Sequence, residues 1–172
     1  LLFSLVQAAA CGAVNAKLIS PFVGRITDWH KAKLGSNWSD VNNGGANDPG
    51  VTSVKRIFHY YKHFGIATEI MGASFRSIDQ VLGLSGCDLL TVAPNLLAEL
   101  ENDQREVRAQ LSAKDIQVQG ELSPISHADF DAQLKQDPMA SELLQVGIDC
   151  FIKAREQLAA LLRETFLSTT EI

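Results

Sequence analysis

The fold is decided by residues 71–94, MGASFRSIDQVLGLSGCDLLTVAP. The apolar run that ends at Ala73 is strand-like, and a second such run follows at 89–93. Between them, Ser77 and Gln80 have the spacing of a helix capping box, so a short helix is predicted between two buried strands. Such an order implies a right-handed crossover between parallel strands. This stretch therefore predicts an α/β fold with a parallel sheet.

The same alternation of strand and helix extends toward the start of the chain. Short apolar runs at 1–3 and 18–23 predict two more strands, and the residues between them suit a helix. Asp48 can cap free amide groups and Pro49 suits the first helical position, so another helix is predicted to begin there. About four such units are present, which is roughly half of what an eight-unit barrel requires.

Two later segments depart from this alternation. Residues 34–47 are rich in Asn, Gly and Ser and have no hydrophobic period, so we expect a loop there. Asp137 and Pro138 begin a long predicted helix, and mixed charges along it disfavour a membrane-bound helix. We expect its apolar side to pack on the body of the protein. That side consists of Met139, Leu143, Val146, Phe151, Leu158, Leu161, Leu162 and Phe166.

The composition narrows the range of partners. The chain of 172 residues carries a net charge of -5, with a pI of about 5.3, so we expect it to bind neither nucleic acid nor an anionic membrane. Cys11, Cys87 and Cys150 lack the spacing of a disulfide framework or a zinc site. We interpret them as reduced thiols of a cytoplasmic protein.

The opening residues 1–14, LLFSLVQAAACGAV, superficially resemble a secretory signal. They include no initiator Met and no positively charged leader, and the run is too short to span a bilayer. We therefore interpret them as the end of a strand followed by a helix, in a chain whose true beginning lies upstream.

Two segments each place a hydroxyl and a guanidinium group just beyond a predicted strand. Ser20 and Arg25 follow one strand, and Ser74 and Arg76 follow the next. In parallel α/β folds the carboxyl ends of the strands form the ligand face, so both pairs should face one site. Together with nearby helix amides they could hold a phosphate group. Alternatively, each Ser only caps a helix and each Arg is a solvated surface charge; the recurrence at two strand ends favours the anion site.

These residues lie within motifs that resemble the second half of the transaldolase family. The motifs occur in the family's order and approximate spacing. They are LISPFVGRITDW at 18–29, DPGVTSV at 48–54, the stretch at 71–94 and QDPMA at 136–140. The resemblance is most specific over residues 1–100.

The resemblance implies a (β/α)8 TIM barrel in the full protein. Residues 1–110 would cover the carboxyl-terminal half of the barrel, and residues 111–172 would form a helical segment that packs on it. The implied enzyme transfers a dihydroxyacetone unit from sedoheptulose 7-phosphate to glyceraldehyde 3-phosphate, yielding erythrose 4-phosphate and fructose 6-phosphate. This reaction belongs to the non-oxidative pentose phosphate pathway and uses a lysine Schiff base, with no metal or organic cofactor.

The resemblance also implies roles for individual residues. Arg25, Ser74 and Arg76 match the family's phosphate ligands. Ser20 and Phe22 match the residues that line the carbon chain of the substrate. Phosphorylated sugars are therefore the expected ligands.

The resemblance places the Schiff-base lysine and its acidic partners on strands before Leu1, so we expect no catalytic residue in this chain. Lys17 precedes its strand and should lie on the opposite face of the barrel. The other candidates sit on helices or loops, where we expect too little desolvation to lower an amine pKa; they are Lys31, Lys33, Lys55 and Lys62. We therefore expect an inactive fragment that binds the amino-terminal half of the same protein, or pairs as a homodimer.

Other residues that could carry chemistry receive structural interpretations. His59 and His63 have the spacing of a helical ligand pair, but a partly exposed helix face explains them better than zinc. Asp28 and Trp29 match a family motif and are expected to pack the strand-to-helix turn. Cys87 precedes a strand, as does Asp88, so both should lie on the structural face.

Two other functions stay open. One is a non-catalytic half barrel that binds sugar phosphates through its arginines alone. The other is a different Schiff-base aldolase of the same barrel class, which would share the phosphate ligands but use another acceptor. The loop at 34–47 differs from the family pattern, so no role is assigned to it.

Overall fold

A three-stranded parallel sheet lies at the centre of the computed structural model, which describes residues 1–114 and 125–167. Its strands are β1 (Leu18–Ile19), β2 (Glu69–Gly72) and β3 (Leu89–Leu90), and they neighbour one another in chain order. Both pairings are parallel. The α/β class and the parallel sheet expected from the sequence are therefore confirmed.

The register of the sheet extends beyond the three strands. Leu18 lies opposite Glu69 in the first pairing. A parallel bridge joins Leu2 to Pro21, and another joins Phe22 to Ala73. The start of the chain thus runs beside the extension of β1, where the sequence predicts a strand end.

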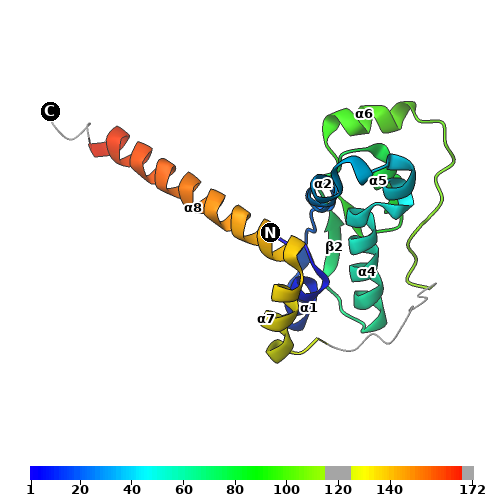
Figure 1. Cartoon of the computed structure of the whole chain (residues 1–172), viewed down its shortest axis with the longest axis horizontal. Coiled ribbons are helices and arrows are strands. Elements are labelled where there is room, and N and C mark those ends of the chain that lie inside the picture. The colour runs from blue at the N-terminus through cyan, green and yellow to red at the C-terminus, as the bar shows by residue number, and fades with distance from the viewer. Residues whose placement is uncertain (115–124, 168–172) are drawn as a thin grey trace.

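Helices surround the sheet as Figure 1 shows. The helices of the first part are α1 (Leu5–Ala13), α2 (Val23–Leu34), α4 (Pro49–His63), α5 (Ile78–Gly83) and α6 (Pro94–Asn102). Between α2 and α4 the chain forms only short turns, namely η1 (Gly35–Asn37), α3 (Asp40–Asn43) and η2 (Gly45–Asn47). The absence of a hydrophobic period at 34–47 correctly indicated this irregular segment.

Helix caps are found at the predicted positions Asp48 and Ser77 and also at Ser4, where none was predicted. The Ser4 hydroxyl accepts a hydrogen bond from the Gln7 amide, and the Asp48 carboxylate accepts one from the Val51 amide at 3.0 Å. Ser77 accepts one from the Gln80 amide. These bonds satisfy amide groups that have no partner within the helix.

The core lies between the sheet and α4, whose inward side is fully buried. Val51, Val54 and Ile57 of α4 have no exposed surface, and Ile70 of β2 is equally buried. Tyr61 is buried too, and its hydroxyl donates to the Ala8 carbonyl of α1 at 2.6 Å. Burial raises the pKa of this phenol, so it stays a neutral donor that ties α4 to α1.

The last two helices, α7 (His127–Gln136) and α8 (Pro138–Leu167), differ in how they meet the body. Helix α7 packs on α1, whereas α8 leaves the body and extends away from it (Figure 1). Met139 and Ala140 of α8 are buried in a cluster with Phe3 and Ile26.

The expectation that the whole apolar side of the last helix packs on the body is wrong beyond its first turns. The exposed apolar residues of α8 are Val146, Ile148, Phe151, Ile152, Leu158, Leu161, Leu162 and Phe166. A 30-residue helix is about 45 Å long, so most of it outruns the surface that its first turns contact. Among residues 1–114 and 125–167, no helix is long and apolar enough to cross a membrane.

Candidate functional site

The structure brings together the two segments that carry the predicted site residues. The Val23 amide, at the start of α2, donates to the Ala73 carbonyl at 2.9 Å, and the Gly24 amide donates to the Ser74 carbonyl at 2.9 Å. Both segments leave the carboxyl ends of their strands, β1 and β2. The two segments therefore lie side by side at the carboxyl end of the sheet, and the prediction that their side chains face one site stays a prediction.

Gly24 allows the first turn of α2 to approach the turn formed by residues 74–76. A Cβ atom at position 24 would overlap the Ser74 carbonyl oxygen and lie 2.8 Å from Nη1 of Arg76. Only a residue without a side chain fits against this backbone. The sequence offers no local signal for this requirement, because the contact joins residues far apart in the chain.

Ser74 and Arg76 form one hydrogen-bonded unit. Nη1 of Arg76 donates to the Ser74 carbonyl at 2.9 Å and to the Ser74 hydroxyl oxygen at 3.1 Å. Because that hydroxyl accepts from the guanidinium, its own proton is free to donate to a ligand. Ser74 holds a left-handed backbone conformation with φ of 65°, which is uncommon for a residue other than glycine.

Asp28 of α2 holds the other side of the Arg76 guanidinium. Its Oδ2 atom accepts from Nη2 at 2.7 Å and from Nε at 3.1 Å. The two side chains are 54% and 45% exposed, so the pair is only partly shielded from solvent. The expectation that Asp28 only packs the strand-to-helix turn therefore misses its ionic contact with the predicted phosphate ligand.

Trp29 is also placed differently from that expectation. Its indole Nε1 donates to the Glu142 carboxylate of α8 at 2.8 Å, and Lys33 donates to the same carboxylate at 3.4 Å. The hydrogen bond from Trp29, followed by that from Lys33, lowers the pKa of Glu142. Trp29 therefore links α2 to the first turns of α8.

Arg25 lies exposed in the first turn of α2, with its guanidinium over the Phe22 ring at 4.8 Å from the ring centroid. In the described part of the chain no carboxylate pairs with it. The ring thus supports a cation whose donors are open to an anion. Ser20 donates to the Met71 carbonyl at 3.1 Å, which holds it at the end of β1.

Helix amides contribute less to this site than the sequence suggests. The first two amides of α2 are those of Val23 and Gly24, and both already donate to strand carbonyls. An amide that pairs with the backbone is not available to a phosphate group. These two amides therefore add nothing to an anion site, and the roles of Ser20, Phe22, Arg25, Ser74 and Arg76 stay predictions.

A buried polar cluster lies behind the site. The Thr27 hydroxyl donates to the Asp48 carboxylate at 2.8 Å, and Nε2 of Gln80 donates to the same carboxylate at 2.9 Å. Oε1 of Gln80 accepts the backbone amide of Arg76 at 2.7 Å. The capping box predicted at Ser77 is therefore only half formed, because the Gln80 side chain joins this cluster instead of reaching back to its own helix cap.

The lysines lie at their expected positions, but the expectation about desolvation is wrong for one of them. Lys17 is 89% exposed and pairs with Glu69, the first residue of β2, so it lies at the amino end of the sheet. Lys62 pairs with Asp88 at 2.7 Å. For Lys55, however, burial lowers the pKa, so the expectation of no such desolvation is wrong there. Lys55 lies within α4, and its sequence neighbours are helical residues rather than a strand end.

The cysteine and histidine candidates keep their structural interpretations. Burial raises the pKa of the Cys87 thiol, which makes it a poor nucleophile. His59 is partly buried on α4 and His63 is exposed near its end. Within residues 1–114 and 125–167, no cluster of three or more His, Cys, Asp or Glu could hold a metal ion.

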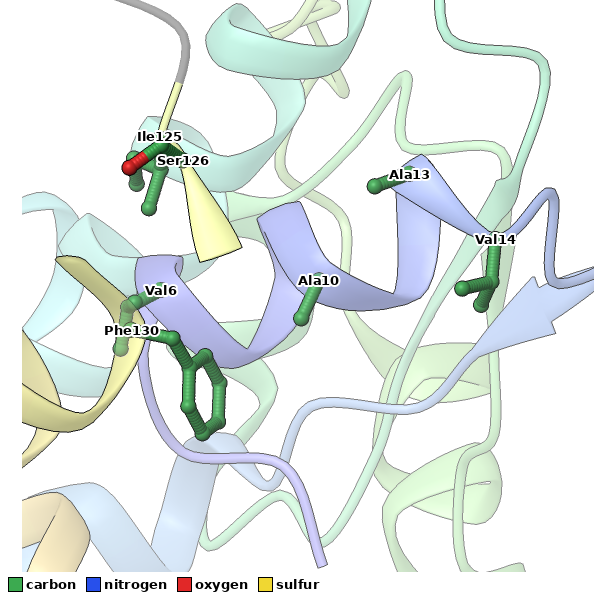
Figure 2. Close-up of a pocket in the computed structure, with 7 residues that line it drawn as sticks. All are labelled: Val6, Ala10, Ala13, Val14, Ile125, Ser126 and Phe130. Atoms are coloured by element: carbon green, nitrogen blue, oxygen red, sulfur yellow. The ribbon is translucent and has the colours of Figure 1, made fainter. Parts of the chain in front are cut away.

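Two of the hollows near these elements lack the chemistry of a phosphate site. One, of about 280 Å³, is lined by Arg76 and Lys31 but also by several carboxylates, namely Asp28, Asp40, Asp48 and Asp79. Such a lining disfavours an anion. The other, also of about 280 Å³, is apolar and lies between α1 and the start of α7 (Figure 2). Its lining consists of Val6, Ala10, Ala13, Val14, Ile125, Ser126 and Phe130.

The family comparison agrees with this geometry. Residues 1–162 match the family described as transaldolase/fructose-6-phosphate aldolase. The match includes both strand ends, the buried cluster and most of α8. An aldolase-type activity on sugar phosphates accords with paired strand ends that carry hydroxyl and guanidinium groups. The chain therefore belongs to the transaldolase/fructose-6-phosphate aldolase family.

Proposed function

We propose that this chain carries the phosphate-binding part of a transaldolase of the non-oxidative pentose phosphate pathway. The observation that supports the proposal most is the backbone pairing of the two strand ends. It sets the Ser74 and Arg76 unit against the helix turn that holds Arg25. Two guanidinium groups and a hydroxyl donor from neighbouring strands suit a phosphoryl group.

In this proposal the bound phosphate orients the sugar for carbon–carbon bond cleavage. A dihydroxyacetone unit passes from sedoheptulose 7-phosphate to glyceraldehyde 3-phosphate, which leaves erythrose 4-phosphate and forms fructose 6-phosphate. A lysine amine forms a Schiff base with the donor ketone, and its protonated nitrogen accepts the electrons of the broken bond. Ser20 and Phe22 line the carbon chain, so that the phosphate contacts and these residues fix the reacting atoms in place.

We propose that the Schiff-base lysine comes from residues outside this sequence. Among the described residues, no lysine directly follows the carboxyl end of a strand. Within residues 1–114 and 125–167 the sheet also has two open edges, at β3 and beside Leu2. Open sheet edges and exposed apolar surface are features that a partner typically covers. We propose that the amino-terminal half of the same protein, or a second half barrel, completes a (β/α)8 barrel.

We place the protein in the cytoplasm, where the proposed pathway operates. Cys11, Cys87 and Cys150 are free thiols, and a reducing compartment keeps thiols in that state.

Borohydride trapping with fructose 6-phosphate tests the proposal. Purified material is first checked by intact mass for a second polypeptide, and then reduced in the presence of the sugar. We expect a covalent sugar adduct on a lysine of the partner polypeptide and none on this chain. An adduct on Lys17 or Lys55 of this chain would contradict the assignment of the lysine to a partner.

The second candidate function is a non-catalytic module that binds sugar phosphates. Among the described residues no lysine directly follows a strand, and this favours a non-catalytic module if the chain acts without a partner. Calorimetry would then show binding of glyceraldehyde 3-phosphate, while trapping would label no polypeptide in the sample. A Schiff-base aldolase with another acceptor is separated from a transaldolase by a coupled assay, because only the transaldolase uses erythrose 4-phosphate as an acceptor of the dihydroxyacetone unit.

A further inference from the structure

Both polar atoms of the Gln80 side-chain amide form hydrogen bonds within the buried cluster. Its Oε1 atom accepts the Arg76 amide at 2.7 Å, and its Nε2 atom donates to Asp48 Oδ2 at 2.9 Å and to Thr27 Oγ1 at 3.0 Å. Gln80 is only 3% exposed. A flipped amide would set an NH2 group against the Arg76 amide and an oxygen against a carboxylate. The surrounding groups therefore fix one orientation of this side chain.

Asp48 makes this arrangement rigid. Its carboxylate is 2% exposed, and in the described part of the chain no lysine or arginine pairs with it. The Val51 amide, the Thr27 hydroxyl and the Gln80 amide supply its hydrogen bonds. A buried charge without a cation needs all these donors, so losing one is costly. If Asp48 only capped α4, the Val51 amide would be a sufficient donor, and the buried side-chain amide of Gln80 would not be needed.

The cluster is also the link between three helices and the turn that carries the predicted phosphate ligand. Thr27 belongs to α2, Asp48 caps α4 and Gln80 belongs to α5. The Arg76 amide comes two residues after Ser74, whose backbone is left-handed. An uncommon conformation of this kind persists only where surrounding contacts hold it.

We infer that Gln80 is a positioning residue of the sugar-phosphate site. Its side chain fixes the backbone of Arg76, so that the guanidinium and the Ser74 hydroxyl present their donors together. The inference rests on the proposed function, since it assigns Gln80 a role in binding the phosphoryl group without touching it.

The test uses phosphate binding by the whole chain, with inorganic phosphate and glyceraldehyde 3-phosphate as calorimetric titrants. Gln80→Met keeps the length of the side chain but removes its hydrogen bonds, and we expect it to weaken binding about tenfold. Gln80→Glu keeps the acceptor for the Arg76 amide but sets an oxygen against the Asp48 carboxylate, so it is combined with Asp48→Asn, which restores a donor between the two side chains. This double variant should lose less. Val81→Ala is the matched control, because Val81 is a buried apolar neighbour on α5. It should lower the melting temperature and leave phosphate affinity unchanged.

A double-mutant cycle shows whether Gln80 acts through Arg76. We expect the double variant Gln80→Met, Arg76→Ala to bind phosphate no more weakly than Arg76→Ala alone. Fully additive losses would overturn the inference, as would a Gln80→Met variant that loses stability like the control but binds phosphate like the wild type.

Hydrogen exchange at the Arg76 amide separates this inference from the proposed function. The amide should be protected in the wild type and in the double variant Gln80→Glu, Asp48→Asn and exchange faster in Gln80→Met. If protection follows this pattern while no form binds phosphate, the proposed function fails and the positioning of Arg76 by Gln80 stands. An unprotected Arg76 amide in the wild type overturns the inference whatever the affinities.

Discussion

The carboxyl end of the sheet and the outer part of α8, residues 148–162, differ in how far their side chains are covered by the described residues. At the sheet end, backbone amides, a buried carboxylate and the guanidinium of Arg76 all pair within the chain. Along the outer part of α8, large apolar side chains such as Phe151, which is 63% exposed, face solvent. One region is organised by contacts within this chain, and the other presents a surface that residues 1–114 and 125–167 do not cover.

This difference distinguishes a region that can form a binding site within this chain from a surface that requires another element to cover it. Hydrogen bonds that close within the chain can fix a binding site without help, because each buried polar group already has its partner. An exposed apolar helix side of this length is typical of a surface that another element covers. We therefore keep phosphate binding by this chain as our proposal and expect the proposed partner to contact α8.

The largest expected effect comes from removing the arginines at the sheet end. Arg25→Ala and Arg76→Ala should each weaken binding of phosphorylated substrates by about 2 to 4 kcal/mol, since each removes charge-assisted hydrogen bonds. Titration of glyceraldehyde 3-phosphate measures this. Arg56→Ala removes an exposed cation of α4 and serves as the control. Equal affinities in all four proteins would remove the anion site from the proposal.

A smaller effect is expected from filling the close approach at Gly24. Gly24→Ala should destabilise the protein by about 2 to 3 kcal/mol, because the new Cβ would overlap the Ser74 carbonyl. Gly35→Ala is the matched control, since no atom lies within 4 Å of its Cβ position. Its cost, from a positive φ of 53°, should be about 1 kcal/mol. Urea denaturation measures both, and equal costs would show that the two segments are not in close contact.

The two ends of α8 should respond differently to the same kind of truncation. Met139→Ala should cost about 2 kcal/mol, because Met139 is buried against the body. Leu158→Ala should change stability by less than about 0.5 kcal/mol in the isolated chain, since that side chain is exposed. Thermal melts of both variants test this. A large loss from Leu158→Ala would mean that the outer part of α8 packs on the body in solution.

The smallest effect is a pH dependence at the junction of α2 and α8. The pKa of Glu142 is lowered in the folded protein by hydrogen bonds from Trp29 and Lys33. The ionised Glu142 carboxylate therefore stabilises the folded protein at pH values above the ordinary glutamate pKa. This stabilisation is lost as the pH falls through the lowered pKa of the folded protein. The melting temperatures of the wild type and Glu142→Gln should differ at neutral pH and converge in acid. A difference that persists unchanged in acid would contradict this linkage.

Local signals were sufficient to predict the α/β class, the parallel sheet and several helix starts. The caps at Asp48 and Ser77, the start of α4 and the irregular segment at 34–47 depend on residues close in sequence, and the structure confirms them. The course of α8 was not predictable in this way. Its apolar pattern shows that the helix should be covered, but no pattern shows whether the covering surface belongs to the same chain.

The candidate site was only partly predictable for the same reason. The positions of Arg25 and Arg76 follow from strand ends, which a sequence can reveal. The contacts of Asp28 and Gln80 join segments that are distant in the chain. Residue spacing alone therefore predicted only that Asp28 packs a turn and that Gln80 belongs to a helix cap. The desolvation of Lys55 likewise depends on tertiary packing.

A phosphate titration followed by backbone and arginine side-chain NMR tests the central claim most directly. Inorganic phosphate and glyceraldehyde 3-phosphate are added in turn to the labelled chain. We expect the largest shift changes at Arg25, Ser74 and Arg76, together and with one dissociation constant. Changes confined to one of the two strand ends, or centred on the apolar hollow at Val6 and Phe130, would contradict a shared phosphate site.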